Sequence, residues 1–223
     1  MPARTTLAMK STDLIRQTYA GKTIGRILGN WAIARECRNL SGSVVDLAAG
    51  GSPSYYRYLP KGLVLTRTDV HPGPGIDRIV DLNEPLPFKD GEFDAALMFG
   101  ALYILEDPLR TLREVRRILA PRGSFYLALP FLLGEIPEPH DYGRWTGEGL
   151  ERLLRQAGFV SVRIVRVGGP FTAAANLLHA YLYFDTVRLA VSAAALACDR
   201  LARAVRPKLA ARSPISYLCI AAK

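Results

Sequence analysis

Cysteine, histidine and tryptophan are scarce in this sequence of 223 residues. The three cysteines, Cys37, Cys198 and Cys219, are scattered, odd in number and without the paired spacing of a zinc site. We therefore expect reduced thiols in a cytoplasmic protein and no bound metal.

The sequence also lacks long apolar runs. Residues 1–10 do not contain the apolar stretch of a secretory signal. The most apolar segment, residues 168–206, is interrupted at residues 168–170 and at Asp185 before the roughly twenty apolar residues of a membrane span accumulate. No internal repeat or low-complexity tract divides the chain, so we expect a single domain over residues 1–223.

Acidic residues are few at the two ends of the chain. The formal net charge of +9 is divided into +7 for residues 1–67, −5 for residues 68–159 and +7 for residues 160–223. Basic ends of this kind can contact nucleic acid or an anionic membrane surface. However, no Lys/Arg run is interleaved with aromatic residues as in an RNA-binding platform. We expect a small-molecule substrate rather than nucleic acid, and peripheral membrane contact stays open.

The most informative motif surrounds Asp46. Residues 44–47 have the composition of a buried strand, and residues 48–51 are small enough to let the backbone approach a ligand. Ser52 and Pro53 then predict a helix N-cap and first helical residue, whose N–H groups would face the same place. Many α/β proteins contain such a turn without a ligand, so this motif alone does not decide a function.

Two further acids follow predicted strands. Residues 63–69 end at Asp69, and residues 79–83 form a short strand candidate that closes on Asp81. An acid at such a place in a nucleotide-binding unit can accept hydrogen bonds from ribose hydroxyls. The alternative for each acid is a solvated residue at the end of a strand. A fourth strand is predicted over residues 93–100.

The order of these motifs, together with residues 86–88 and 117–123, resembles the class I S-adenosylmethionine-dependent methyltransferases of the type 11 group. The resemblance covers about residues 42–168. It implies that the first loop holds the methionine end of the cofactor S-adenosyl-L-methionine, that Asp69 holds the ribose and that Asp81 reaches the adenine amino group. The cofactor-binding residues implied in this way are Asp46, Ala48, Ala49, Gly50, Ser52, Asp69, Val70, Asp81, Leu82, Phe99 and Gly100.

The chain departs from the family pattern in two places. The first and third glycines of the family's loop are here Ala48 and Ser52, so that only Gly50 matches. Where relatives often carry Leu-Glu-His after the fourth strand, this chain has Leu102-Tyr103-Ile104. Because of these two departures, an alternative stays open: the protein has this fold but catalyses a different reaction or serves a non-catalytic binding role.

Strand and helix patterns alternate along the chain. Helices are predicted over residues 11–38 and 108–119, and further strands over residues 124–129, 160–167 and 215–221. We expect an α/β fold with a doubly wound, Rossmann-like sheet, and the resemblance implies seven strands with the last one antiparallel. A ligand crevice is expected at the carboxyl ends of the parallel strands, covered by an N-terminal helical cap over residues 1–40.

Residues 130–146 follow the fifth strand and should form a lid on the crevice side of the sheet. Their His-Asp-Tyr string resembles a narrower subset of type 11 methyltransferases. Methyl transfer to a hydroxyl benefits from a base, and His140 is the best-placed candidate, with Asp141 orienting its ring or taking the proton itself. We also expect substrate contacts from Tyr103, Tyr142, Arg144 and Trp145.

A structural interpretation of the same lid stays open. Thr146 can cap a helix that begins at Gly147, and Arg144 can pair with Asp141. If the chain is a methyltransferase, we expect it to act on a small, hydroxylated and partly hydrophobic acceptor, with O-methylation favoured.

Residues 168–206 form a helical insertion between the last two predicted strands. From Val167 to Cys198 the only charged residues are Asp185 and Arg188, so much of the insertion is apolar. Such a surface needs cover. The alternatives are a hydrophobic substrate pocket, a homodimer interface, a seat on a membrane surface, or two helices packed on their own domain.

Overall fold

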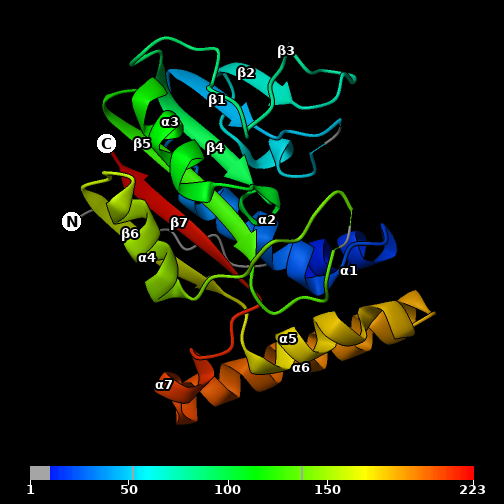
Figure 1. The fold of residues 1–223 in the computed structure, drawn as a ribbon. Coiled ribbons are helices and arrows are strands. Elements are labelled where there is room, and N and C mark those ends of the chain that lie inside the picture. Colours follow the sequence, from blue (N-terminus) through cyan, green and yellow to red (C-terminus); the bar gives the residue numbers. More distant parts are fainter. Residues whose placement is uncertain (1–10, 52, 137) are drawn as a thin grey trace.

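A mixed β-sheet organises the chain, and the computed structural model describes it over residues 11–51, 53–136 and 138–223. Its strands are β1 (Ser43–Leu47), β2 (Val64–Asp69), β3 (Arg78–Ile79), β4 (Phe93–Phe99), β5 (Leu119–Pro130), β6 (Ser161–Val167) and β7 (Ser216–Ala222). They form one seven-stranded sheet in the order β3-β2-β1-β4-β5-β7-β6 (Figure 1). Only β7 runs antiparallel to its neighbours, β5 and β6. The predicted seven-stranded sheet is confirmed.

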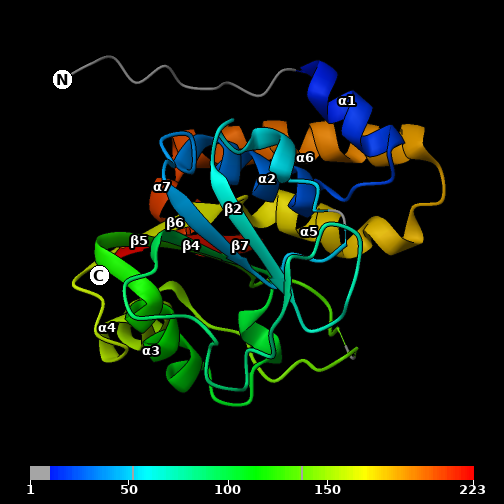
Figure 2. The same ribbon diagram turned by 90° about the horizontal axis from the view of Figure 1, so that it is seen from above.

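Helices cover both faces of the sheet. They are α1 (Ser11–Tyr19), α2 (Ile24–Glu36), α3 (Pro108–Ile118), α4 (Gly147–Gln156), α5 (Pro170–Leu178), α6 (Asp185–Val205) and α7 (Pro207–Ala210). Figure 2 shows α3 and α4 on one face, with α1, α2, α5 and α6 on the other. The strand β1 lies between β2 and β4 under both layers, and its residues 44–47 are all buried. This explains why its sequence is apolar throughout and not alternating.

Two helix starts agree with the sequence. Asp107 caps α3, accepting a hydrogen bond from the Arg110 N–H at 3.0 Å. Thr146 caps α4 in the same way, through the Gly149 N–H at 3.1 Å. Both helices pack apolar residues onto the main core of the domain, and that core includes the buried residues Phe125 and Phe159.

Three local predictions were wrong. In the described segment 53–63 no α-helix follows the Asp46 loop, and the chain forms only the short 3₁₀ helix η1 (Tyr56–Tyr58). Pro60 holds the preceding Leu59 in an extended conformation, and Gly62 turns the chain at a φ of 85°, so the helix cannot continue. The third strand ends at Ile79 and not at Asp81.

The third correction concerns residues 11–38, where one helix was expected and two are present. Gly21 adopts a φ of 73°, a left-handed conformation that ends helical hydrogen bonding. The chain re-enters a helix at Thr23, whose side chain caps α2 by accepting from the Arg26 N–H at 3.2 Å. The break places residues 21–23 at the mouth of the cleft described below.

The insertion between β6 and β7 is a helical hairpin of α5 and α6. A short 3₁₀ turn, η3 (His179–Tyr181), and an extended residue, Leu182, separate its two arms. Asp199 of α6 is fully buried and accepts hydrogen bonds from the Phe171 N–H, the Thr172 N–H and the Thr172 hydroxyl at the start of α5. One carboxylate therefore caps α5 and ties the two arms together.

Candidate functional site

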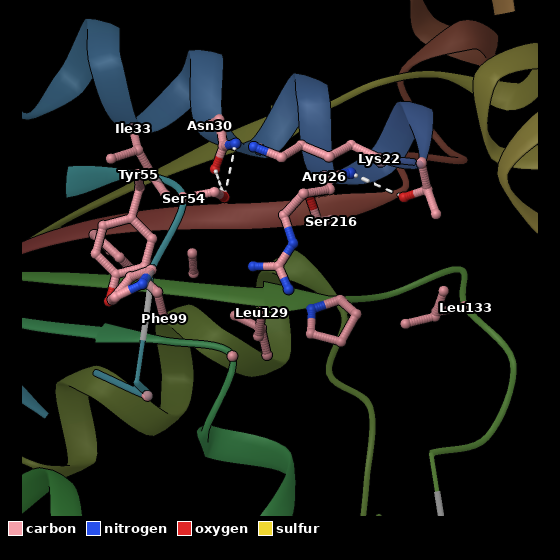
Figure 3. A pocket seen from close by; sticks show the side chains of 18 of the residues that line it. Lys22, Arg26, Asn30, Ile33, Ser54, Tyr55, Phe99, Leu129, Leu133 and Ser216 are labelled. Carbon is pink, nitrogen blue, oxygen red and sulfur yellow. Dashed lines mark hydrogen bonds between the residues drawn. The ribbon is translucent and has the colours of Figure 1, made fainter. Parts of the chain in front are cut away.

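A cleft of about 850 Å³ opens at the carboxyl ends of the parallel strands. Its floor is the loop after β1, at residues 48–51. Its two sides are α2 and the ends of β4 and β5 (Figure 3). The volume lies within the roughly 300–1,000 Å³ typical of small-molecule sites. The position agrees with the expected crevice of a doubly wound sheet.

The floor of the cleft has an unusual backbone. Ala48 and Gly50 both adopt left-handed conformations, with φ values of 63° and 67°. This conformation is uncommon for alanine and is typical of functional sites, where surrounding contacts hold it in place. A Cβ atom added to Gly50 or Gly51 would meet no atom within 4 Å, so the loop faces open space on the ligand side. The small residues keep this space free.

Asp69 holds the floor in place from the end of β2. Its Oδ2 accepts a hydrogen bond from the Gly50 N–H at 2.9 Å, and its Oδ1 accepts one from the His71 N–H at 3.1 Å. The side chain is only partly buried, which leaves the outer lone pairs of the carboxylate accessible to a ligand. Asp69 therefore joins the first loop to the second strand at one edge of the site.

Asp46 lies beneath the floor and is fully buried. Its Oδ2 accepts a hydrogen bond from the Tyr55 hydroxyl at 2.7 Å, whereas its Oδ1 has no partner among the described residues. Burial raises the pKa of Asp46 to about 7, because desolvation outweighs the opposing effect of the Tyr55 hydroxyl and of the nearby Tyr56 hydroxyl. Asp46 supports the loop and does not line the cleft.

The helix α2 and Lys22 just before it supply a polar wall that was not predicted from the sequence. Lys22, Arg26 and Asn30 line the cleft, and Asn30 is hydrogen-bonded to Ser54 at 3.0 Å. Figure 3 shows the Arg26 side chain reaching from α2 into the cleft. The pKa of Lys22 is lowered, first by burial and then by the nearby cations Arg57, Arg26 and Arg16. This wall favours anionic groups of a ligand.

The opposite wall is apolar. It is formed by Phe99, Leu129, Leu133 and Ile136, at the ends of β4 and β5 and in the loop beyond β5. Tyr103 also lines the cleft, and burial raises the pKa of its phenol. A polar wall facing an apolar wall suits a ligand that has one charged part and one hydrophobic part.

The structure brings some of the predicted site residues together. Ala48, Ala49, Gly50, Phe99, Gly100 and Tyr103 line the cleft. The other described cofactor candidates lie outside its lining: Asp46, Asp69, Val70, Asp81 and Leu82. Val70 and Asp81 are exposed, Leu82 is buried, and Asp81 accepts a hydrogen bond from the Asn83 N–H at 2.9 Å. Ser52 lies outside the described residues.

The predicted lid residues form a structural cluster beside the cleft. Arg144 binds the carboxylate of Asp141 through both terminal nitrogens, one of them 2.6 Å from Oδ2, and this ion pair lowers the pKa of Asp141. Asp141 also accepts from the Ile136 N–H at 2.9 Å. The Arg144 guanidinium lies over the Tyr103 ring, 5.3 Å from its centroid. The predicted pairing of Arg144 with Asp141 is thus present.

His140 and its neighbours do not line the cleft. The His140 ring is exposed and stacks on Tyr142, with the ring centroids 5.1 Å apart. Trp145 packs against the main core instead. His140 and Asp141 are adjacent in sequence, but the carboxylate is engaged by Arg144 and the Ile136 N–H.

Residues 62–127 match the methyltransferase domain family. The matched stretch runs from just before β2 into β5 and covers less than a third of the chain. A demethylmenaquinone methyltransferase of Renibacterium salmoninarum is 32% identical over 94 residues, which cover 38% of this chain and 40% of that relative. The match thus spans about two fifths of the length of the curated relative.

Two solved structures share the fold of this chain over most of its length. A complex of the Haloferax volcanii Trm112 methyltransferase activator with a methyltransferase has a TM-score of 0.59, at 18% identity and 93% coverage of both chains. Phosphoethanolamine N-methyltransferase 2 of Haemonchus contortus, in complex with phosphomonomethylethanolamine and S-adenosylhomocysteine, has a TM-score of 0.55 at 13% identity. That match covers 87% of this chain and 52% of the other. At these identities the likeness shows the fold alone.

Other classes of site receive no support within the described ranges. No group of three or more His, Cys, Asp or Glu side chains there is placed to hold a metal ion. None of the helices in those ranges combines the length and the apolar character needed to cross a bilayer.

Proposed function

We propose that this chain is an S-adenosylmethionine-dependent methyltransferase that acts on a small, partly hydrophobic acceptor. The observation that carries the proposal is the cleft floor: a left-handed loop after β1, clear of side chains, bound at Gly50 by the Asp69 carboxylate. The small residues of the loop let a ligand approach the backbone closely, and Asp69 supplies acceptors for hydroxyl groups.

The residues of the site fit this cofactor. The loop at residues 48–51 would take its methionine end, and Lys22 and Arg26 offer positive charge for its carboxylate or for an anionic acceptor. Asp69 would accept from the ribose hydroxyls, with Asp81, Val70 and Leu82 further along the same edge. When bound, the cofactor supplies a methyl group on a sulfonium centre, which a nucleophile can attack directly.

The chain's own contribution is to orient the acceptor and to exclude water. Alignment of reactants can supply roughly 7–11 kcal/mol of a reaction barrier, so little further chemistry is needed. Leu129, Leu133 and Ile136 provide an apolar surface for the acceptor next to the polar wall. The relative named for demethylmenaquinone supports a partly hydrophobic acceptor of this kind.

The finer part of the proposal is O-methylation assisted by His140. A hydroxyl acceptor loses its proton as the bond to carbon forms, and histidine can take that proton near neutral pH. His140 is exposed at the lid, so this role requires the lid to close over the cleft. We further propose that α1 and α2, which flank the cleft mouth, act as its cap.

A methyl-transfer assay tests the proposal. The full chain is incubated with S-adenosylmethionine labelled in the methyl group and, in turn, with reduced quinones, hydroxylated aromatic acids and phosphoethanolamine. We expect label to pass to one of these classes, with the highest rate for an acceptor that has a hydroxyl and an apolar part. The Asp69→Ala variant should lose this activity, while Asp94→Ala, at the opposite end of the sheet, should keep it.

The alternative is that this chain has the fold but catalyses another reaction or only binds a ligand. Binding of S-adenosylmethionine without transfer to any acceptor class would favour this alternative, and the absence of cofactor binding would exclude the proposed reaction.

A further inference from the structure

The hairpin of α5 and α6 carries an apolar tip. Tyr181, Tyr183 and Phe184, at the turn between the two helices, are 73%, 84% and 72% exposed, and Leu177 and Leu178 are about half exposed. Within the described residues, no other element covers this tip. Large side chains at such exposure are costly for a surface in contact only with water, which indicates a partner surface.

The outer face of α6 continues the apolar surface. The exposed positions between Val187 and Val205 include Ala190, Ala194, Ala197, Cys198 and Leu201. They recur at helical spacing, so they form one stripe along the helix. The polar residues Ser192 and Asp199 lie on the opposite side and are buried against the domain. The hairpin therefore has an apolar stripe that extends from its apolar tip.

The other end of the hairpin is basic. The surface there carries five exposed cations along α6, α7 and the segment after α7: Arg200, Arg203, Arg206, Lys208 and Arg212. The only acids in residues 168–223 are Asp185 and Asp199. Asp185 is paired with Arg188, and Asp199 is buried as the cap of α5. The surface thus combines apolar groups with uncompensated positive charge.

We propose that this surface, residues 177–212, docks on an anionic lipid membrane. Aromatic and leucine side chains beside a row of cations match the boundary between lipid headgroups and acyl chains. The charge argues against a second copy of the chain as the occupant, because self-association would bring two net-positive surfaces together. Anionic headgroups instead complement the basic end.

The position of the tip relates this docking to the cleft. Asn176 of α5 lines the cleft, and the exposed Leu177 and Leu178 follow it directly. At the cleft mouth, Tyr19 is exposed at the end of α1, just before the lining residues 21–23. The cleft therefore opens next to the surface that would meet the lipid. Docking would therefore allow an apolar acceptor to pass from the membrane into the cleft. This last step rests on the proposed function, whereas the docking itself does not.

Vesicle sedimentation tests the docking with the full chain. Vesicles of phosphatidylcholine alone are compared with vesicles that also contain phosphatidylglycerol. We expect the wild-type protein to sediment with the mixed vesicles only, and less as salt is added. Arg200→Glu/Arg203→Glu should weaken this binding by at least about 25-fold, since each basic residue contributes roughly a fivefold factor. Tyr183→Ser/Phe184→Ser should also weaken it.

A matched control uses the opposite face of the domain. Arg113→Glu/Arg152→Glu changes the net charge equally but alters α3 and α4, on the other side of the sheet (Figure 2). We expect these changes to leave vesicle binding within about twofold of wild type, because screening weakens charges far from the contact. Equal loss in both charge variants would overturn a defined docking surface.

Cys198 provides a second readout. It is exposed on the outer face of α6, whereas Cys37 and Cys219 are buried, so a polarity-sensitive dye can be attached at this one site. We expect the dye to report an apolar environment with mixed vesicles. Failure of the wild type to bind them would overturn the proposal, as would a concentration-dependent dimer or RNA binding in its place. S-Adenosylmethionine binding measured in the same variants should be unchanged, which separates failed docking from a failed cofactor site.

Discussion

The Tyr55 hydroxyl lies 2.7 Å from Oδ2 of Asp46, beneath the floor of the cleft. The Tyr55 ring also packs edge-on against Phe99, with the ring centroids 4.9 Å apart. This residue therefore connects the 3₁₀ segment after the loop to the ends of β1 and β4. Tyr55 thus supports the loop from a segment where the sequence predicted a helix. Its hydroxyl also gives the buried carboxyl group of Asp46 a hydrogen-bond partner.

Asp46 makes the stability of the domain depend on pH. Its pKa is raised from 3.8 to about 7 by burial, so the folded state binds the proton more tightly than the unfolded chain does. The contribution of this group to the free energy of unfolding is therefore full below about pH 4 and is lost as pH rises to about 7, by about 1.4 kcal/mol per unit.

Asp46→Asn should remove that dependence and keep the bond from Tyr55. We expect the free energy of unfolding of wild type, minus that of the variant, to fall steadily between these two pH values in urea titrations. A constant difference would mean that Asp46 is ionised in the folded protein throughout.

Asp69→Ala should weaken the binding of S-adenosylmethionine. The change removes the acceptor that holds the Gly50 N–H and the proposed acceptor for the ribose. Hydrogen bonds to a charged group contribute about 1.5–3 kcal/mol, so the dissociation constant should rise about 10- to 100-fold. Asp94→Ala is the matched control, because Asp94 bonds Ser43 at the start of β1, far from the cleft. Equal affinity in both variants would remove Asp69 from the site.

The sequence predicted the sheet because its strands are short apolar runs that end in acids or turns. It could not predict the wall formed by Lys22, Arg26 and Asn30. Arg26 and Asn30 have an ordinary helical pattern, and Lys22 directly precedes it. Only the break at Gly21 and the packing of α2 on the sheet bring these residues to the strand ends. The loop was predicted from Asp46 and the small residues that follow it. The hydrogen bond between Tyr55 and Asp46 could not be predicted, because it depends on how the chain folds back after the loop.

His140→Ala should reduce turnover by about 100-fold if His140 is the base for a hydroxyl acceptor. The affinity for S-adenosylmethionine should not change, because His140 lies outside the cleft lining. The matched comparison is Tyr142→Ala, which removes the ring on which His140 stacks. Turnover that is lost in both variants to the same extent would indicate a positioning role for the stacked pair. Unchanged turnover in His140→Ala would leave acceptor alignment as the whole mechanism.

Asp199→Ala should destabilise the hairpin of α5 and α6. It leaves the N–H groups of Phe171 and Thr172 buried without their acceptor, at a cost of roughly 2–4 kcal/mol in the free energy of unfolding. Asp185→Ala removes a partly exposed ion pair on the same helix and should cost about 1 kcal/mol or less. Urea unfolding of the two variants measures the difference. Similar losses would show that Asp199 does not act as the link between the helices.

Calorimetric titration of the full chain with S-adenosylmethionine, and with its demethylated product, tests the central claim most directly. The cleft floor after β1 and the carboxylate of Asp69 predict saturable binding of both compounds at one site per chain, abolished or strongly weakened in Asp69→Ala. Binding of neither compound at millimolar concentration would contradict the account and leave the fold without its proposed reaction.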